Sequence, residues 1–155
     1  MPKKLAVLFL CTGNSCRSQM AEGWTRALKG DLIEPASAGT EPRGLDPRAV
    51  RVMAEAGVDL SGGRAPHVRE RAGRSCDSVV TVCSAAAENC PVFPGRTRVI
   101  HRGFDDPPRL ARDAKTEEEA LAHYRRVRDE IRGFVEGLPG LIDEPGGPSR
   151  RRSEE

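Results

Sequence analysis

The segment near the N-terminus whose residue types could carry out chemistry runs from Cys11 to Ser18 and reads CTGNSCRS. A run of β-forming residues precedes it and apolar residues at helical spacing follow it. We therefore expect Cys11 at the end of a strand, a five-residue loop, and Arg17 at the start of a helix. Such a loop can aim backbone N–H groups, the positive end of the helix dipole and a guanidinium at one tetrahedral oxyanion above the sulfur.

The same arrangement would make Cys11 a nucleophile, because the N–H groups and the hydroxyl of Ser18 would stabilise its thiolate. We predict that the oxyanion is bound by Thr12, Gly13, Asn14, Ser15, Cys16, Arg17 and Ser18. The alternative is a buried cysteine at a strand end, followed by an unrelated surface arginine. A nucleotide-type phosphate loop is excluded, since no Gly-Lys-Ser/Thr follows.

Two later cysteines, Cys83 and Cys90, flank a stretch of strong helix formers and lie seven positions apart. In a helix their Cα atoms would be about 10.5 Å apart, whereas a disulfide needs them within about 7 Å. A bond between the two sulfurs would thus require this segment to unwind. The spacing by itself slightly favours two structural thiols over a redox pair.

The elements that would position these residues alternate between strand and helix. Strands are predicted over 4–10, 32–37, 77–83 and 97–101, and helices over 18–29, 46–56 and a last, long one. A capping box of Thr116 and Glu119 begins that last helix, and its apolar face comprises Leu121, Tyr124, Val127, Ile131, Phe134, Val135 and Leu138. The pattern predicts an α/β fold, a single domain with a four-stranded parallel open sheet flanked by helices.

Length and composition limit the class of protein. The 155 residues fit one domain, which we place at 1–142, with a mobile tail of Pro, Gly, Ser and charged residues at 143–155. We see no signal peptide or membrane span, and the net charge of +2 is too small and too dispersed to favour nucleic acid. Five cysteines without Cys-x-x-Cys pairs argue for reactive or buried thiols in a reducing compartment, the cytoplasm, and against zinc.

At the level of whole segments, the chain resembles the thioredoxin-coupled arsenate reductases that share the low-molecular-weight tyrosine phosphatase fold. The similar segments are VLFLCTGNSCRSQMAEG at 7–23, SAGT at 37–40, VVTVCSAAAENCP at 79–91, GFDDP at 103–107 and YRRVRDEI at 124–131. The resemblance extends to about residue 138. Phosphatases and reductases share the loop, so the loop indicates oxyanion chemistry and the later cysteines indicate which reaction.

The resemblance implies a relay of three thiols. Cys11 would attack arsenate, Cys83 would attack Cys11 as arsenite leaves, and Cys90 would attack Cys83, leaving a disulfide for thioredoxin to reduce. The family's general acid directly precedes a proline, which points to Asp106 rather than Asp105. From the residues alone, two carboxylates in a loop are as often plain turn residues. No cofactor is expected beyond the electrons of thioredoxin.

Two cysteines and a possible cation site remain. We expect Cys16 to be a structural thiol that faces away from the pocket, and Cys76 to pack in the core. Some relatives bind potassium beside the loop, and Asn14, Glu22 and Ser37 match three of those ligands. The fourth position falls near Pro66, which cannot supply a carboxylate, so the potassium site is a weak candidate.

Rival functions are a low-molecular-weight tyrosine phosphatase, a non-catalytic oxyanion-binding module, and an arsenate reductase coupled to a low-molecular-weight thiol. A tyrosine phosphatase would not need Cys83 or Cys90, and aromatic residues make up only 4% of this chain. A binding module would lack the nucleophile, the arginine or the acid. Enzymes that use a low-molecular-weight thiol can dispense with Cys90. We favour a monomeric enzyme of arsenic detoxification with weak phosphatase activity.

Overall fold

The computed structural model describes residues 4–13, 16–61, 66–72, 76–83 and 97–143, and its centre is a four-stranded sheet. The strands are β1 (Leu5–Cys11), β2 (Ile33–Gly39), β3 (Ser78–Thr81) and β4 (Arg98–His101), in the spatial order β2-β1-β3-β4. All three strand pairs are parallel. The predicted fold class is therefore confirmed, and the four predicted strands are all present.

The two central strands, β1 and β3, are the most buried part of the sheet, and the sequence of β1 is apolar throughout. Every residue of β3 is buried, as are Val7 to Cys11 of β1. A parallel sheet is covered on both faces, so its central strands read as continuous apolar runs rather than alternating ones. The edge strand β4 is less buried, with Val99 40% exposed. The carboxyl ends of β1 and β3 thus lie side by side in the middle of the sheet.

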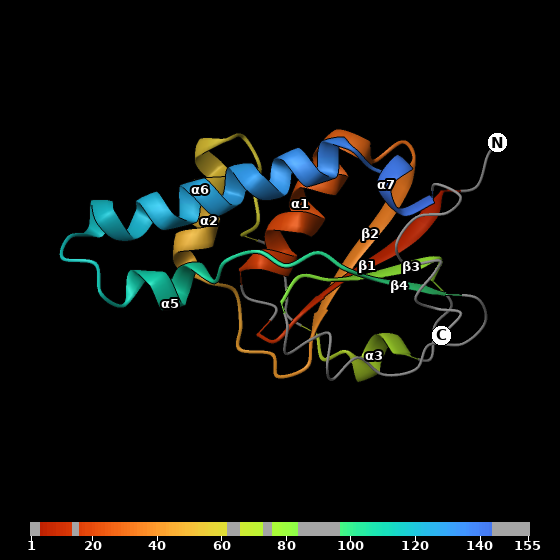
Figure 1. Cartoon of the computed structure of the whole chain (residues 1–155), viewed down its shortest axis with the longest axis horizontal. Helices are drawn as coiled ribbons and strands as arrows, with labels where there is room; N and C mark the ends of the chain where they lie inside the picture. The colour runs from red at the N-terminus through yellow and green to blue at the C-terminus, as the bar shows by residue number, and fades with distance from the viewer. Residues whose placement is uncertain (1–3, 14–15, 62–65, 73–75, 84–96, 144–155) are drawn as a thin grey trace.

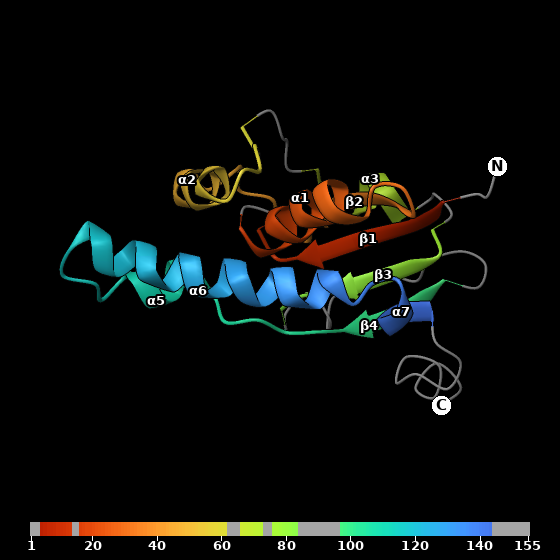
Figure 2. The same ribbon diagram turned by 90° about the horizontal axis from the view of Figure 1, so that it is seen from above.

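The two long helices pack against each other on one face of the sheet (Figures 1 and 2). These are α1 (Arg17–Lys29) and α6 (Glu117–Glu136). The shorter helices are α2 (Pro47–Glu55), α3 (Arg69–Ala72), α5 (Pro107–Ala111) and α7 (Gly140–Asp143). Figure 1 shows α3 on the opposite face of the sheet from α1 and α6. The predicted helices are confirmed, whereas α3, α5 and α7 were not predicted because four or five residues carry too little periodicity.

Helix α6 begins at the predicted cap. The hydroxyl of Thr116 accepts a hydrogen bond from the N–H of Glu119 at 3.1 Å. The Glu119 carboxylate accepts from the N–H of Lys115, one residue before the position that a capping box uses. The predicted apolar face is confirmed, since all its members are buried except Phe134, which is partly buried. The helix ends at Glu136, and Gly137 caps it.

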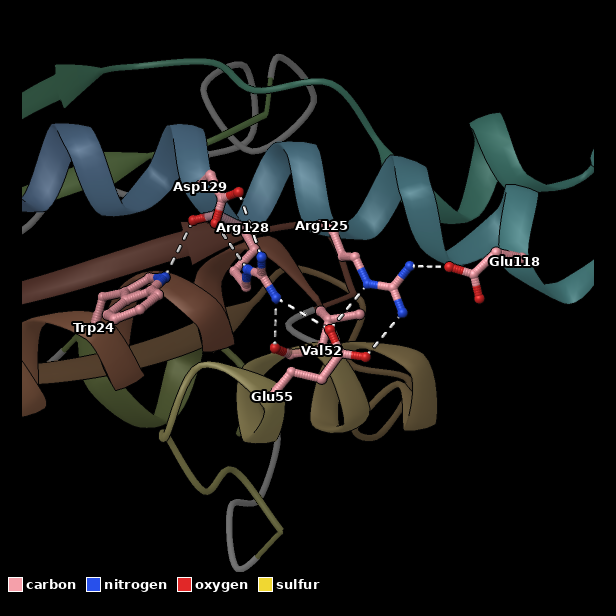
Figure 3. Close-up of polar contacts among 7 residues, drawn as sticks. All are labelled: Trp24, Val52, Glu55, Glu118, Arg125, Arg128 and Asp129. Carbon is pink, nitrogen blue, oxygen red and sulfur yellow. Dashed lines mark hydrogen bonds and ion pairs between the residues drawn. The ribbon is translucent and has the colours of Figure 1, made fainter.

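A cluster of arginines and carboxylates, which we call the α2–α6 cluster, joins α6 to α2 (Figure 3). Arg125 makes two hydrogen bonds to Glu55, both of 2.9 Å, and also contacts Glu118. Arg128 donates to the carbonyl of Val52 at 2.9 Å and pairs with Glu55 at 3.3 Å. The backbone carbonyl of Arg128 accepts from the indole N–H of Trp24 in α1. These contacts fix three helices relative to one another.

The C-terminal prediction falls largely outside the described residues. Helix α7 ends at Asp143, one residue past the domain end that we predicted. The rest of the predicted tail, 144–155, lies outside the described residues. Among the helices that the structure describes, none combines the length and the apolar character needed to cross a membrane.

Candidate active site

The nucleophile candidate lies where the sequence placed it, at the junction of β1 and α1. Cys11 is the last residue of β1, Arg17 is the first residue of α1, and Cys83 follows the end of β3 by two positions. Because β1 and β3 are parallel neighbours, their carboxyl ends meet at the same edge of the sheet. In open α/β sheets, ligands bind outside this edge.

The Cys11 thiol is buried, with 3% of the residue exposed. Its Sγ lies 3.2 Å from the Oγ of Ser18, which stands in the first turn of α1. This is the contact that the sequence predicted, and from there the hydroxyl can donate to a thiolate. Burial and a directed hydroxyl therefore hold the sulfur in one position at the helix start.

The segment after β2 fixes the start of the loop. Three loop carbonyls accept hydrogen bonds from it: Cys11 from Thr40 (3.2 Å), Thr12 from Glu41 (2.8 Å) and Gly13 from Arg43 (3.0 Å). In a planar trans peptide, the C=O of one residue points opposite to the N–H of the next. The N–H groups of Thr12 and Gly13 thus point away from segment 40–43, available to an anion. Pro42, which has no N–H, is the one residue of 40–43 that makes no such bond.

Arg17 connects the loop to the segment that carries the acid candidates. Its guanidinium donates to the carbonyl of Phe104 at 2.9 Å and lies 3.5 Å from a carboxylate oxygen of Asp106. Only 13% of the Arg17 side chain is exposed. The arginine is therefore held at the pocket from the side opposite to its own helix.

The two adjacent carboxylates are separated by the fold. Asp106 directly precedes α5 at its N-cap position, without a side-chain capping hydrogen bond, and lines the pocket. Asp105 is 64% exposed, pairs with Arg126 at 2.9 Å and is not among the residues that line the pocket. The structure thus brings Asp106, and not Asp105, to Cys11 and Arg17.

A second thiol stands at the loop. Cys83 is 7% exposed, and its Sγ lies 3.3 Å from the Oγ1 of Thr12, the residue after Cys11. Cys90 lies outside the described residues, as do Asn14, Ser15 and segment 84–96, for which we predicted unwinding on oxidation. The pairing of Cys83 with Cys90 therefore stays a prediction.

These groups surround one pocket with a volume of ≈ 340 Å³. It brings together the predicted residues Cys11, Arg17, Cys83 and Asp106. It also contains three arginines that the sequence analysis missed, namely Arg43, Arg109 and Arg112. The spacing of Arg109 and Arg112, three apart after Pro107-Pro108, could have revealed two cations on one face of a short helix.

The remaining cysteines fill structural places. Cys16 is 3% exposed, and burial, followed by the nearby Asp46, raises the pKa of its thiol well above the usual value. Cys16 is among the residues that line the pocket, while the direction of its thiol stays a prediction; the raised pKa favours the neutral thiol. Cys76 packs against the core, as expected, and its carbonyl accepts from the Thr97 hydroxyl at 2.6 Å.

The described part of the potassium candidate is engaged by other donors. Ser37 donates to one carboxylate oxygen of Glu22 at 2.5 Å, and Arg26 donates to the other at 2.8 Å. A cation beside Glu22 would have to compete with the Arg26 guanidinium. The backbone carbonyl of Pro66, at the fourth position, accepts from the N–H of Gly39. These residues do not fit a potassium site.

A partly buried hydrogen bond joins α6 to the start of α2. Tyr124 of α6 donates to a carboxylate oxygen of Asp46 at 2.7 Å, and the other oxygen accepts from the N–H of Arg48. Asp46 thus caps α2 and anchors the end of the segment that holds the loop. Burial and the bond to Asp46 raise the pKa of Tyr124, so the phenol keeps its proton.

Comparison with known proteins places this site among related ones. Residues 6–144 match the family model described as low molecular weight phosphotyrosine protein phosphatase. The arsenate reductase of Bacillus subtilis (strain 168) is 49% identical over 125 residues, which cover 81% of this chain and 88% of that protein.

Solved structures agree with the architecture. One described as an arsenate reductase in the phosphate binding state has a TM-score of 0.69 and 29% identity, covering 86% of this chain and 95% of that chain. The thioredoxin-dependent arsenate reductase of Corynebacterium glutamicum has a TM-score of 0.66 and 23% identity, covering 87% of this chain and 60% of that chain. At that identity the second match supports the fold alone.

Proposed function

The chain belongs to the low molecular weight phosphotyrosine protein phosphatase family, and from this premise we propose that it is an arsenate reductase whose electrons pass through Cys11, Cys83 and Cys90. The observation that carries the proposal is the second thiol beside the loop. Cys83 is 3.3 Å from Thr12 and lines the same pocket as Cys11. Hydrolysis of a phosphate ester needs one nucleophilic sulfur, whereas reduction of arsenate needs a second thiol that can reach the first.

The first step is substitution at arsenic. The Sγ of Cys11 forms a bond to arsenic while one hydroxyl group of arsenate takes up a proton and leaves as water. The N–H groups of Thr12 and Gly13, and the Arg17 guanidinium, would bind the remaining oxygens. Asp106 is the group that would supply the proton, because it lines the pocket and its carboxylate lies 3.5 Å from the Arg17 guanidinium.

The second step moves the electrons. The Sγ of Cys83 attacks the Sγ of Cys11, a disulfide forms, and the sulfur–arsenic bond breaks with its electron pair staying on arsenic. Arsenic(V) becomes arsenic(III), and arsenite leaves. Cys90 then attacks Cys83, which frees Cys11 and leaves a disulfide between Cys83 and Cys90. Thioredoxin, a dithiol, would reduce that disulfide by exchange.

The pocket lining suits this reading better than the phosphatase alternative. None of the described residues that line the pocket is aromatic, so a phosphotyrosine ring would find no stacking partner there. Small phosphate esters remain substrates for weak hydrolysis, since phosphate and arsenate have the same shape.

The test is arsenite production from arsenate with thioredoxin, thioredoxin reductase and NADPH, compared with glutathione and glutaredoxin. We expect turnover with thioredoxin, thioredoxin reductase and NADPH. After one cycle, peptide mapping should identify a disulfide between Cys83 and Cys90. Cys83→Ser and Cys90→Ser should keep ester hydrolysis and lose catalytic reduction, and Cys76→Ser is the matched control that should keep both. If arsenite forms while Cys83 and Cys90 both stay alkylatable, the relay is wrong and an external thiol attacks the Cys11 adduct.

A further inference from the structure

The mouth of the pocket holds more positive charge than one oxyanion requires. Among the described residues, four arginines line the pocket against one carboxylate, that of Asp106. Arg17 is already engaged with Phe104 and Asp106 at the loop. The three other arginines, Arg43, Arg109 and Arg112, are exposed, and none has a role in the proposed relay.

These three arginines lack firm partners within the part of the chain that the structure describes. Arg43 lies 3.8 Å from Glu41, with both side chains about 70% exposed (69% and 73%), and exposed pairs of this kind contribute little. The guanidinium groups of Arg109 and Arg112 contact no carboxylate among the described residues. Arginines whose charge stays uncompensated beside a cavity are available to bind a ligand anion.

The size of the pocket also indicates room for a second anionic group. Its volume is ≈ 340 Å³, whereas a water molecule occupies about 30 Å³ of the liquid. A tetrahedral anion of four oxygens needs the space of a few waters, so one oxyanion on the loop would leave much of the pocket open. Arg109 and Arg112 line the same pocket but do not belong to the loop that would hold the first oxyanion.

We propose that Arg109 and Arg112, together with Arg43, form a second anion subsite, which binds a further anionic group of a small ligand whose first oxyanion occupies the loop. The ligand class is a tetrahedral oxyanion that carries a second phosphate or carboxylate group, and diphosphate is its simplest member. Arg109 lies in α5 and Arg112 is its C-cap residue, whose backbone is still helical, so the two side chains, three positions apart, extend from one face. The subsite rests on the oxyanion pocket of the proposed function, but not on the cysteine relay.

Calorimetric binding of inorganic phosphate and of diphosphate to the reduced wild-type protein, in magnesium-free buffer, tests the subsite. One charge-assisted hydrogen bond corresponds to about a tenfold gain in affinity, so diphosphate should bind about tenfold tighter than phosphate, or more. The double variant Arg109→Gln/Arg112→Gln should lose this preference and bind phosphate within about twofold of the wild type. Arg132→Gln on α6, which removes one positive charge outside the pocket, should keep the preference.

Each other outcome overturns the subsite. Equal affinities for the two anions in the wild type, or a preference that survives the double substitution, would show that these arginines hold no second group. An equal loss for phosphate and diphosphate would show that they only attract anions towards the loop. If phosphate itself fails to bind the wild type, the oxyanion site and the proposed function fall together, which separates that failure from the others.

Discussion

The α2–α6 cluster and the mouth of the pocket both gather arginines, but described carboxylates meet them closely in only one of the two regions. In the α2–α6 cluster, Arg125 and Arg128 share Glu55 and reach further acceptors (Figure 3). At the pocket, Arg109 and Arg112 meet no carboxylate of the described chain. The first arrangement satisfies its charges within the fold, and the second leaves them for a ligand.

The difference shows how one residue type serves two purposes. An arginine that is paired with carboxylates holds together the helices that carry both groups, and its N–H donors are then not available to a substrate. An arginine without such partners adds nothing to folding, but it raises the local concentration of anions. Arg17 combines both features: it is held by the Phe104 carbonyl and by the 3.5 Å contact to Asp106, and it also lines the pocket.

The largest effect is expected from Arg17→Ala compared with Arg125→Ala. Arg17→Ala should abolish both arsenate reduction and the hydrolysis of small phosphate esters, because the same guanidinium would clamp the oxyanion in both reactions. Its thermal unfolding should change little. Arg125→Ala should instead lower the unfolding temperature and leave kcat/KM unchanged, since its partners Glu55 and Glu118 lie in the α2–α6 cluster. Normal reduction by Arg17→Ala would remove the distinction between the two regions.

The next effect concerns the carboxylates. Asp106→Ala should slow turnover by about 10²- to 10⁴-fold, the usual loss for a general acid. Asp105→Ala should do much less, because Asp105 pairs with Arg126 outside the pocket. Steady-state rates with a small phosphate ester measure both variants in the same assay. Equal losses would show that the position before Pro107 does not define the acid.

The sequence predicted the fold well because its signals were local and strong. The strand 5–11 reads as a continuous apolar run, and Thr116 with the apolar face after it indicated α6. The loop was predictable as well, since a cysteine, five residues and an arginine at a strand–helix junction have one mechanical use. Cys11, its hydroxyl partner Ser18, and Arg17 lie as predicted.

What the sequence did not reveal depends on contacts between distant segments. The segment 40–43 holds the loop through backbone N–H groups, which leave no mark on side-chain types. Glu55 and Arg125 are seventy positions apart, and no periodicity links them. Arg43 and Arg109 meet at one pocket only because β2 and α5 end near the same edge of the sheet. In a single sequence such pairs look like ordinary surface charges.

A smaller effect should separate two glycines with the same backbone conformation. Gly44 has φ +86° beside the pocket, and Gly57 has φ +88° after α2; a Cβ at either would meet no atom within 4 Å. Alanine at each should therefore cost only the left-handed strain of about 1–2 kcal/mol, seen as equal falls in the free energy of unfolding. Only Gly44→Ala should raise KM for arsenate, because Gly44 follows Arg43, whose N–H holds the Gly13 carbonyl. An equal KM in the two variants would mean that segment 40–43 does not set the loop.

The smallest effect is the pH dependence of the α2–α6 cluster. Hydrogen bonds from Arg125 lower the pKa of Glu55 from 4.5 to about 2. Because the folded pKa lies below the unfolded value, the stabilisation from this carboxylate is complete above pH 4.5 and is lost as the pH falls towards 2. The carboxylate is exposed to solvent, so the change in unfolding temperature should be a few degrees at most.

Glu55→Gln should lower the unfolding temperature at neutral pH, and the difference between this variant and the wild type should shrink as the pH falls from 4.5 towards 2. Glu34→Gln, on the exposed side of β2 and without a described ion pair, is the matched control and should show no such convergence. A difference that stayed constant from pH 5 to pH 2 would show that the paired arginines contribute through packing alone, and the contrast with the pocket would then rest on geometry rather than on charge.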